Sequence, residues 1–490
     1  MQLFNLKTIW RSTPTPILEL GVCSQSFRSL GLKWAEKELS KHYTDCHDNL
    51  SPSVARFRAQ SVINLLRSID RAVADGRIGH RVRRSIIDIF IGFFVMEDKQ
   101  RQDCFFKRHG FEPPSFLVIS PTKKCNLRCM GCYAGSSAQN AETLSYAVLQ
   151  RIIREKTEQW GSHLTVLSGG EPLLYKSEGK DLFDLLRENQ DNYFMAFTNG
   201  TLITRDVAEK IAQLGNLSLA ISVEGWEKET DERRGKGIFS KILRSMEHLR
   251  AAGVPFGIST TPTRKNAEVI LSDEFIDFFF KTQGAVYGWM FQYMPIGRSY
   301  TVDLMVTPEQ RHWMAQKQVE LIQKGLFYVD FWNGGPLTIG CISAGRPGGY
   351  FYIDWNGNIA PCTFFPYYID NIYDIYRREL DLSAVLQSKY FRAIRAWQCN
   401  YAYKQPPEKV QNLLVPCPYR DHYEEAYRLV QEHGARPMDE NAATAIKDEM
   451  YRRKMIAMGK RYGEALSAVW QQQFCGLCRD DLKKGCGCHL

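Results

Sequence analysis

The chain has 490 residues, enough for roughly two to four domains and for a large core. Hydrophobic residues make up 44% and charged residues 24% of the sequence, which excludes a mainly disordered chain. No apolar run approaches the roughly 20 residues of a membrane-spanning helix, and the N-terminus lacks the apolar segment of a secretory signal. The fourteen cysteines therefore favour a reducing, cytoplasmic compartment in which clustered thiols bind metal.

The net charge of +9 is concentrated in the first 110 residues, which hold 18 Lys and Arg against 11 Asp and Glu, a net of +7. The densest part is a group of arginines before the apolar run 86–96: Arg77, Arg81, Arg83 and Arg84. Three interpretations are open, namely a buried docking helix with a solvated flank, peripheral contact with an anionic inner-membrane surface, and binding of nucleic acid. The modest charge and the lack of a recognised RNA-binding module disfavour nucleic acid.

Residues 1–110 are predicted to be a mostly helical, basic region. Apolar residues at helical spacing run from 54 to 66, and Gly76 and Gly79 separate this helix from the next. From residue 115, strand-length apolar runs alternate with helical patterns near 145–157, 179–189, 204–213, 239–252 and 272–281. The expected strands are 116–120, 164–168, 193–197, 217–222, 255–260 and 286–294. Six βα units predict an α/β fold, a partial (β/α)6 barrel with its chemistry at the C-terminal ends of the strands.

Thr307 to Gln310 fit a capping box that opens a helix to about residue 325. Beyond it, Asn356-Gly357 predicts a tight hairpin between 350–354 and 358–361, and residues 383–398 and 440–471 are expected to be helical. The predicted domains are a basic helical region at 1–110, a barrel at 111–325, and a small Cys-rich domain at 326–490.

Three cysteines in a C-x3-C-x2-C pattern follow the first expected strand: Cys125, Cys129 and Cys132. Three closely spaced thiolates can hold three irons of a 4Fe–4S cluster and leave the fourth iron open to a ligand. The alternatives are a three-thiolate zinc site and a redox pair at Cys129 and Cys132. A non-enzymatic zinc or iron–sulfur protein is therefore a further interpretation of these cysteines.

This triplet, followed by the aromatic Tyr133, resembles the signature of the radical S-adenosylmethionine (radical SAM) superfamily. Further matches fall at later strand ends, in Ser168-Gly169-Gly170-Glu171-Pro172, Thr198-Asn199-Gly200 and Ser222-Val223-Glu224-Gly225. The resemblance covers about residues 115–300. It implies that the first of these motifs holds the methionine amino group of SAM and that Ser222 and Glu224 hydrogen-bond the ribose. The implied cofactor-binding residues are Tyr133, Gly169, Gly170, Glu171, Pro172, Asn199, Ser222 and Glu224.

The resemblance implies an iron–sulfur enzyme of oxidoreductase or transferase type that works anaerobically. A low-potential donor of the flavodoxin or ferredoxin type would reduce the cluster, SAM would be cleaved to a 5′-deoxyadenosyl radical, and that radical would take hydrogen from an unactivated carbon. The protein must then position the substrate and exclude water. Tyr293 and Arg298, at and just past the sixth strand, are the candidate residues for acting on the substrate.

Cys341, followed by Gly357-x4-Cys362, matches the opening of the SPASM or twitch extension, which carries auxiliary iron–sulfur clusters in many relatives. Cys417 and Cys399 are candidates to complete that site. The chain departs from the usual pattern afterwards, because its last cysteines are Cys475, Cys478, Cys486 and Cys488. Those four suit a second iron–sulfur cluster, a rubredoxin-like iron or a zinc ion, or they are reduced thiols in a loose tail that binds no metal. Cys23, Cys46 and Cys104 are isolated and are expected to be ordinary thiols.

Relatives with such extensions often modify peptides or proteins, so a peptide or protein is the expected substrate. A lipid or another membrane-associated molecule is the alternative, and RNA is third. The sequence does not identify the substrate itself.

Overall fold

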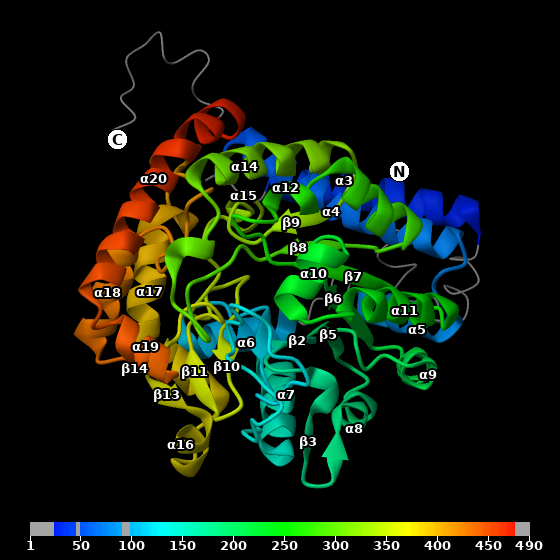
Figure 1. Cartoon of the computed structure of the whole chain (residues 1–490), viewed down its shortest axis with the longest axis horizontal. Coiled ribbons are helices and arrows are strands. Elements are labelled where there is room, and N and C mark those ends of the chain that lie inside the picture. Colours follow the sequence, from blue (N-terminus) through cyan, green and yellow to red (C-terminus); the bar gives the residue numbers. More distant parts are fainter. Residues whose placement is uncertain (1–23, 46–49, 91–98, 476–490) are drawn as a thin grey trace.

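A computed structural model of the chain describes residues 24–45, 50–90 and 99–475. Its centre is an open sheet of eight parallel strands in the order β10-β1-β2-β5-β6-β7-β8-β9 (Figure 1). The eight are β1 (Phe116–Ile119), β2 (Leu164–Leu167), β5 (Tyr193–Thr198), β6 (Leu217–Ser222), β7 (Phe256–Thr260), β8 (Gly288–Met290), β9 (Tyr328–Asp330) and β10 (Tyr352–Ile353). The α/β fold and its six predicted strands are confirmed.

The sheet is wider than predicted, because residues beyond 325 add a strand to each edge. β9 pairs with β8, and β10 pairs with β1 at the other edge, although the two strands are consecutive in the sequence. Residues 331–351 therefore cross from one edge of the sheet to the other. Two antiparallel strands, β11 (Asn358–Ala360) and β13 (Asp370–Asn371), extend the β10 edge. The domain boundary at 325/326 stays a prediction.

The predicted hairpin is present between β10 and β11. The Asp354 amide donates to the Asn358 carbonyl at 3.1 Å, and the Gly357 amide donates to the Asp354 carbonyl at 3.0 Å. Gly357 has φ +78°, a conformation that glycine adopts without strain. Two short ribbons, β3 (Lys176–Ser177) with β4 (Lys180–Asp181) and β12 (Tyr367–Tyr368) with β14 (Arg436–Pro437), lie outside this sheet.

Helices fill the crossovers between the parallel strands. They are α7 (Tyr146–Trp160), η2 (Pro172–Leu174), α8 (Leu182–Glu188), α9 (Arg205–Leu214), α10 (Glu227–Arg234), α11 (Ile238–Ala251), α12 (Ala267–Ile270), α13 (Asp273–Ile276), η3 (Asp277–Thr282), η4 (Val302–Leu304) and α14 (Pro308–Gln323). The capping box of α14 is confirmed, since the side chains of Thr307 and Gln310 each bond the other residue's backbone amide. Helix α10 was not predicted, because it is almost wholly charged and has no apolar period.

The N-terminal helices are α3 (Gln25–Asp45), α4 (Pro52–Ala74), α5 (His80–Phe90) and α6 (Lys99–His109). α4 lies against α14 and α15 (Gly335–Thr338), and the Asn64 amide donates to the Ile322 carbonyl at 2.7 Å. α5 packs against α9, and its Val82 is buried. This region is therefore part of the main body rather than a separate arm.

The C-terminal residues form a helical layer beside the β10 edge (Figure 1). Its elements are α16 (Ile372–Arg377), η5 (Leu382–Gln387), α17 (Lys389–Gln398), η6 (Cys399–Tyr403), η7 (Pro407–Lys409), α18 (Tyr423–His433), α19 (Glu440–Ala445) and α20 (Glu449–Gln473). The long α20 packs along α14 and α18. The predicted helices at 383–398 and 440–471 are confirmed, each as two consecutive elements.

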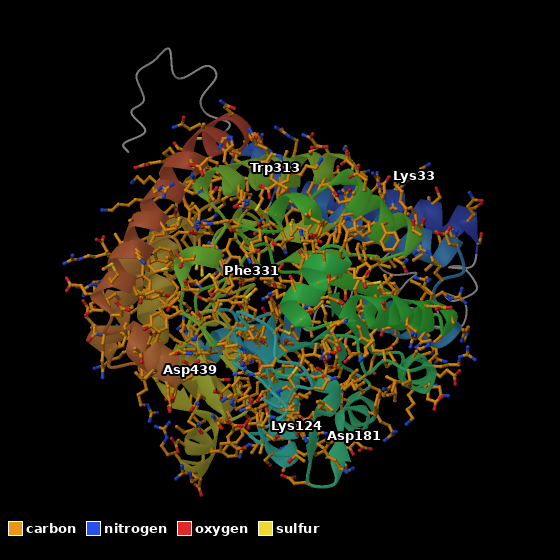
Figure 2. All side chains as sticks on the ribbon, in the orientation of Figure 1. Lys33, Lys124, Asp181, Trp313, Phe331 and Asp439 are labelled. Carbon is orange, nitrogen blue, oxygen red and sulfur yellow. The ribbon has the colours of Figure 1, made fainter. Side chains whose placement is uncertain are left out.

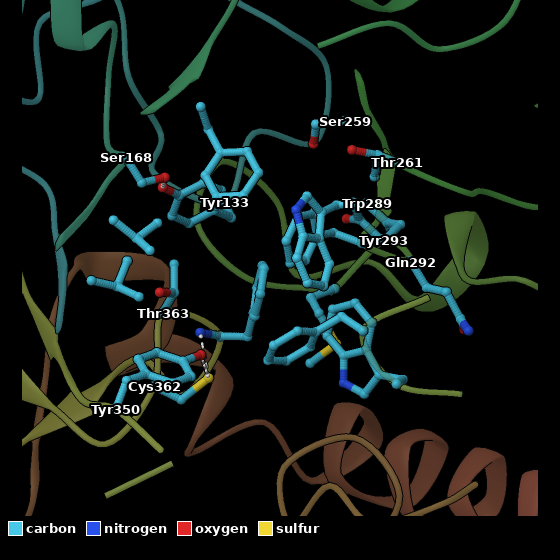
Figure 3. Close-up of a pocket in the computed structure, with 18 of the residues that line it drawn as sticks. Tyr133, Ser168, Ser259, Thr261, Trp289, Gln292, Tyr293, Tyr350, Cys362 and Thr363 are labelled. Carbon is cyan, nitrogen blue, oxygen red and sulfur yellow. Dashed lines mark hydrogen bonds between the residues drawn. The ribbon is translucent and has the colours of Figure 1, made fainter. Parts of the chain in front are cut away.

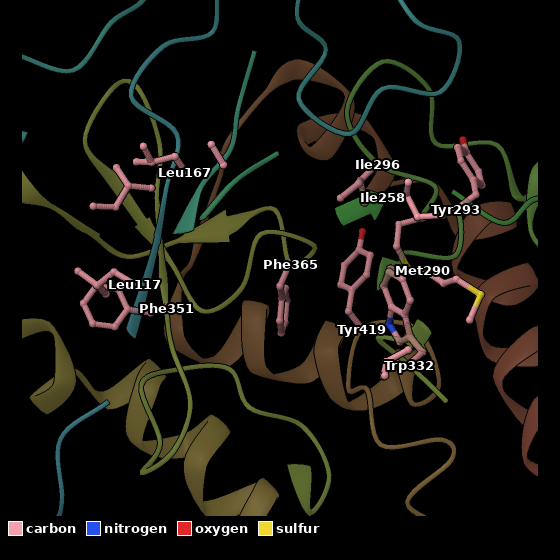
Figure 4. Packing of buried hydrophobic residues seen from close by; sticks show 14 of the residues in the cluster. Leu117, Leu167, Ile258, Met290, Tyr293, Ile296, Trp332, Phe351, Phe365 and Tyr419 are labelled. Atoms are coloured by element: carbon pink, nitrogen blue, oxygen red, sulfur yellow. The ribbon is translucent and has the colours of Figure 1, made fainter. Parts of the chain in front are cut away.

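A single large core joins the strands to these helices. Leu117, Leu167 and Phe351 lie on one side of Phe365, and Trp332 lies on the other side (Figure 4). Figure 2 places Phe331 in the middle of the molecule, whereas the polar labelled side chains lie nearer the outside. The core therefore continues across the predicted boundary between barrel and Cys-rich domain.

In the described part of the chain, no helix is long and apolar enough to cross a membrane. The side chains of the whole apolar run 86–96, on which the predicted membrane contact depends, lie outside the described part of the structure. Arg77 has partners within the protein, Asp75 at 2.9 Å and the Gly284 carbonyl at 2.8 Å. The docking of α5 on α9 agrees with the interpretation of this segment as a packed helix.

Candidate active site

A cavity of about 460 Å³ opens at the C-terminal ends of the parallel strands. Cys125, Cys129 and Cys132 line it from the loop that follows β1 (Figure 3 shows part of the lining). Cys125 is buried, and the other two are half-buried. The three thiols of the predicted cluster loop thus face the same space.

The two glycines after β2 hold this loop in place through their backbones. The Gly170 amide donates to the Thr122 carbonyl at 2.9 Å, and the Glu171 amide donates to the Lys124 carbonyl at 2.8 Å. A Cβ on Gly170 would lie 2.1 Å from the Lys124 carbonyl oxygen, so no larger residue fits without moving the loop. Gly169 and Gly170 also line the cavity, where an unsubstituted backbone can approach a ligand closely.

Glu171 acts as a bridge between loops. Its carboxylate is fully buried and accepts hydrogen bonds from the Thr198 hydroxyl at 2.7 Å and the Asn199 amide at 2.8 Å. Burial raises its pKa, and these donors oppose that rise. Glu171 and Pro172 are not among the cavity-lining residues, whereas Asn199 is, with its side-chain amide 3.7 Å from the Cys125 sulfur. The structure therefore places the backbone of this motif, not its carboxylate, against the cavity.

Tyr133 ties the cysteine loop to the end of β2. Its hydroxyl is 2.6 Å from the Ser168 hydroxyl and accepts a hydrogen bond from the Gly169 amide at 3.0 Å. The ring lines the cavity beside these residues (Figure 3). The aromatic residue after the third cysteine thus positions the loop as well as the wall of the site.

The end of β6 places Ser222 and Glu224 differently. Ser222 lines the cavity, but Glu224 is fully buried and does not. The Glu224 carboxylate pairs with Arg233 at 2.5 Å and with Arg234, and it accepts the Thr261 amide at 3.0 Å. Glu224 therefore orients two arginines, and its expected hydrogen bond to the ribose stays a prediction.

Arg233 and Arg234, at the end of α10, line the cavity and were not predicted as site residues. The Met130 amide donates to the Arg233 carbonyl at 2.9 Å, which fixes α10 beside the cysteine loop. Burial raises the pKa of Cys129, and Arg234 and Arg233 oppose that rise. Their positive charges suit thiolates or an anionic ligand. The only sequence signal was the adjacent pair of arginines soon after the fourth strand.

The remaining predicted substrate residues support the loop. A Cβ on Gly131 would lie 2.6 Å from the Tyr293 ring, and the buried Tyr293 hydroxyl donates to the Ser299 carbonyl at 3.1 Å. Tyr293 lines the cavity, but Arg298 does not. The Arg298 guanidinium donates a hydrogen bond to the Cys129 carbonyl at 3.0 Å, and the backbone amide of Arg298 donates to the Cys132 carbonyl at 2.9 Å. Arg298 is therefore a clamp on the cysteine loop.

A second group of cysteines, Cys341, Cys362 and Cys417, lines the same cavity. Each sulfur has a hydrogen-bond donor or hydroxyl beside it: the Gln398 amide at 3.5 Å from Cys341, the Tyr350 hydroxyl at 3.0 Å from Cys362 (Figure 3), and the Arg420 amide at 3.4 Å from Cys417. The predicted hairpin and the crossing segment 331–351 bring Cys341 and Cys362 to the same space.

The other cysteines lie elsewhere. Cys399, on η6, is half-buried and does not line the cavity, and Cys475 is half-buried at the end of α20. Cys104 is exposed, as expected for an isolated thiol. The predictions for Cys23, Cys46, Cys478, Cys486 and Cys488 fall outside the described residues. Among the described residues, no group of three or more His, Cys, Asp or Glu side chains is arranged so that it could hold a single metal ion. A cubane spaces its thiolates more widely, because each binds a different iron.

Aromatic side chains line the cavity and connect the segments that carry the two groups of cysteines. The ring centroid of Phe364, two residues after Cys362, lies 5.8 Å from that of Tyr133, the residue after Cys132, and 5.7 Å and 5.0 Å from those of Phe291 and Trp332. The indole N–H groups of Trp289 and Trp332 have no hydrogen-bond partner among the described residues. Both nitrogens are themselves buried, so a ligand in this compartment meets mainly apolar surface.

The residues present fit both groups that the sequence implies. Three thiols from one loop suit a 4Fe–4S cluster with one open iron, and the Gly169–Gly170 backbone, Asn199, Ser222 and the arginines suit a ligand with ammonium, carboxylate and hydroxyl groups. The open α/β sheet and this cavity define an enzyme that binds an iron–sulfur cluster and a small cofactor in one pocket.

Comparison with known proteins agrees with that class. Residues 119–270 match the radical SAM superfamily, and residues 341–409 match SPASM, an iron–sulfur cluster-binding domain. The AdoMet-dependent heme synthase of Methanosarcina barkeri is 27% identical over 336 residues, 63% of this chain and 89% of that protein. Mycofactocin maturase MftC of Mycolicibacterium smegmatis is 29% identical over 269 residues, 52% of this chain and 66% of that protein.

The structure of Streptococcus suis SuiB bound to the precursor peptide SuiA has a similar fold, with a TM-score of 0.50 at 18% identity over 62% of this chain and 72% of that one. The chain is a radical SAM enzyme with a SPASM domain. Its cofactors are a 4Fe–4S cluster, SAM and auxiliary iron–sulfur clusters. The identity of each ligand residue remains a prediction.

Proposed function

We propose that this enzyme abstracts a hydrogen atom from a carbon of a peptide or protein and so matures that molecule. The size of the cavity carries this proposal. About 460 Å³ is near the lower end of the roughly 300–1,000 Å³ of a pocket for one drug-sized ligand. SAM is itself a ligand of that size, and the clusters of both cysteine groups would share the same cavity. The little space that remains suits one side chain of a longer substrate better than a large free molecule.

The lining of the cavity agrees with the same substrate class. The aromatic side chains around Phe364 leave an apolar compartment that suits one side chain of a peptide. The printed name of the relative MftC, a maturase, agrees with modification of a precursor.

The proposal gives each group of lining residues a role. Cys125, Cys129 and Cys132 would hold the cluster, whose reduction by a flavodoxin- or ferredoxin-type donor allows SAM to be cleaved. Gly169, Gly170, Asn199 and Ser222 would contact SAM, and Arg233 and Arg234 would face its carboxylate. The second group of cysteines, Cys341, Cys362 and Cys417, would bind an auxiliary cluster. The aromatic side chains around Phe364 would exclude water from the space between them.

The first test is release of 5′-deoxyadenosine by the anaerobically reconstituted and reduced enzyme. The C132A variant is expected to lose this activity, and C104A, which removes an exposed thiol away from the cavity, is expected to keep it. Equal activity of both variants would contradict the assignment of the loop.

The second test addresses the substrate. Extracts of a deletion strain grown in heavy water are separated into peptide and lipid fractions and incubated with the enzyme. Deuterium in 5′-deoxyadenosine is expected from the peptide fraction. Deuterium transfer from the lipid fraction alone would overturn the proposal.

A tetrapyrrole is a second candidate, because the heme synthase relative matches over 89% of its own length. An aromatic compartment also suits a planar molecule. Addition of a porphyrin to the enzyme distinguishes the two, since binding in this cavity would shift the porphyrin absorbance and a W332F variant would weaken the shift.

A further inference from the structure

We propose that Arg346 is the charge partner of the auxiliary iron–sulfur centre and sets its reduction potential from behind Cys341. The proposal rests on the assignment of Cys341 as a ligand of that centre. It concerns a positioning residue outside the cavity, because Arg346 is not among the cavity-lining residues.

Arg346 is buried without a counter-charge. It is 3% exposed, and no ion pair forms at its guanidinium in the described part of the chain. Its Nη2 donates to the Thr338 carbonyl, but Nε and Nη1 have no hydrogen-bond partner. A buried guanidinium with two free donors is costly unless an anion lies nearby.

Arg346 is bonded to the chain on both sides of Cys341. Its guanidinium bonds the Thr338 carbonyl, its backbone amide donates to the Ser343 carbonyl at 3.4 Å, and the Ser343 hydroxyl is 3.2 Å from the Cys341 sulfur. Burial lowers the pKa of Arg346 to about 10, whereas Tyr403, whose ring centroid is 4.2 Å from the guanidinium carbon, and the thiols of Cys341 and Cys399 favour the charged form. Arg58 adds a second positive charge from α4. Arg58 Nε donates to the Leu337 carbonyl at 2.9 Å, and its Nη1 is also buried without a partner.

An iron–sulfur centre held by thiolates supplies the missing negative charge. Neutral thiols leave both arginines uncompensated, whereas deprotonated, metal-bound sulfurs at Cys341 and its neighbours balance them. The reduced centre carries one more negative charge than the oxidised one. A positive charge behind Cys341 therefore stabilises the reduced form and raises the reduction potential.

Arg395 provides the matched control. It is also partly buried and without an ion pair in the described residues, and it lies four residues before Cys399 on the continuous helix formed by α17 and η6. Unlike Arg346, it uses its terminal donors on the carbonyls of Ala344 and Leu386. Substitution of Arg395 therefore tests a charge near Cys399, and substitution of Arg346 tests a charge shared by Cys399 and Cys341.

The experiment uses a background in which Cys125, Cys129 and Cys132 are replaced by alanine, so that only auxiliary centres contribute to the spectrum. Iron and sulfide content and the reduction potential, followed by electron paramagnetic resonance, are measured for R346Q, R346K and R395Q. We expect R346Q to shift the reduction equilibrium at least tenfold toward the oxidised form, about 59 mV for one electron. R346K is expected to keep most of the potential, and R395Q to shift it less.

A potential in R346Q that equals that of the parent would overturn the proposal. If R346Q binds no iron, recovery of iron in R346K supports the role of the charge, whereas equal loss in both variants contradicts it. Neither SAM nor substrate is present, so failure here leaves the proposed reaction untouched. Loss of iron from C341A is the separate check on the ligand assignment.

Discussion

The two groups of cysteines reach the same cavity by different routes. Cys125, Cys129 and Cys132 lie within eight residues on one loop, whereas Cys341, Cys362 and Cys417 are spread over 77 residues. The first group is held by the Gly169–Gly170 backbone and the Arg298 clamp. The second depends on a hairpin, a segment that crosses the sheet and a C-terminal loop. Local sequence therefore supplies all three thiols of the first site, whereas long-range packing is needed to bring the thiols of the second together.

The largest expected difference is in activity. Replacement of Cys125, Cys129 and Cys132 by alanine should reduce 5′-deoxyadenosine formation to the uncatalysed background, because no cluster remains beside SAM. Replacement of Cys341, Cys362 and Cys417 should lower the iron content but retain SAM cleavage. Iron analysis and chromatography of 5′-deoxyadenosine check both. Loss of SAM cleavage in the second variant, with the fold intact by circular dichroism, would show that the two sites are not independent.

Gly170→Ala tests the support of the first site. The new Cβ would lie 2.1 Å from the Lys124 carbonyl oxygen and 2.6 Å from that of Lys123, so the cysteine loop must move. We expect a loss of about 1–3 kcal/mol in the free energy of unfolding, together with weaker cluster retention.

Gly463→Ala is the control for that substitution, because nothing lies within 4 Å of its Cβ position in α20. It should stabilise the protein by about 0.5–1 kcal/mol. Thermal unfolding and iron content are measured for both variants. Similar values for the two would contradict the close contact between the loops.

Asp354→Asn tests the hairpin that supports the second site. Burial raises the pKa of Asp354 to about 6, and the Asn358 and Asn356 amides and Lys123 oppose that rise. Because the pKa in the folded state is above that of an unfolded aspartate, the folded state binds the proton more tightly. Stability from this group is therefore lost as the pH rises through about 6.

Between pH 5 and 7.5, the wild-type protein should lose about 1–2 kcal/mol relative to D354N. Melting curves at several pH values measure the difference, and the Asn side chain keeps an oxygen acceptor for the turn amides. Parallel pH profiles of the two proteins would exclude a raised pKa at this position.

The smallest expected effect concerns the space between the two sites. Trp289→Phe removes an indole N–H that has no partner, so the melting temperature should change by no more than a few degrees. Because the Trp289 ring lines the cavity, the smaller Phe should loosen the fit of the substrate, so its modification should fall by about 5- to 30-fold while SAM cleavage without substrate stays unchanged. Trp160→Phe, whose indole N–H already bonds Ser383 at 2.9 Å, should instead lower stability alone.

The sequence was most informative where a function depends on residues close together in the chain. The six strands, the capping box at Thr307 and the Asn356-Gly357 hairpin were predicted because each leaves a periodic or local pattern. Arg233 and Arg234 were missed because α10 has no apolar face. Glu224 and Arg298 have ion-pair and hydrogen-bond partners that no short pattern indicates, and their predicted roles toward SAM and the substrate stay predictions. Which of its neighbours a charged residue pairs with is a tertiary property.

The sequence by itself determined the class of this enzyme, because C-x3-C-x2-C and the glycine motif act through backbone geometry that neighbouring residues specify. Tertiary structure decided the rest. It joined β9 and β10 to opposite edges of the sheet, brought Cys341, Cys362 and Cys417 into the cavity, left Cys399 outside it, and buried Arg346 without a counter-charge. Those outcomes depend on contacts between residues tens to hundreds of positions apart, which hydrophobic burial selects and which no short pattern records.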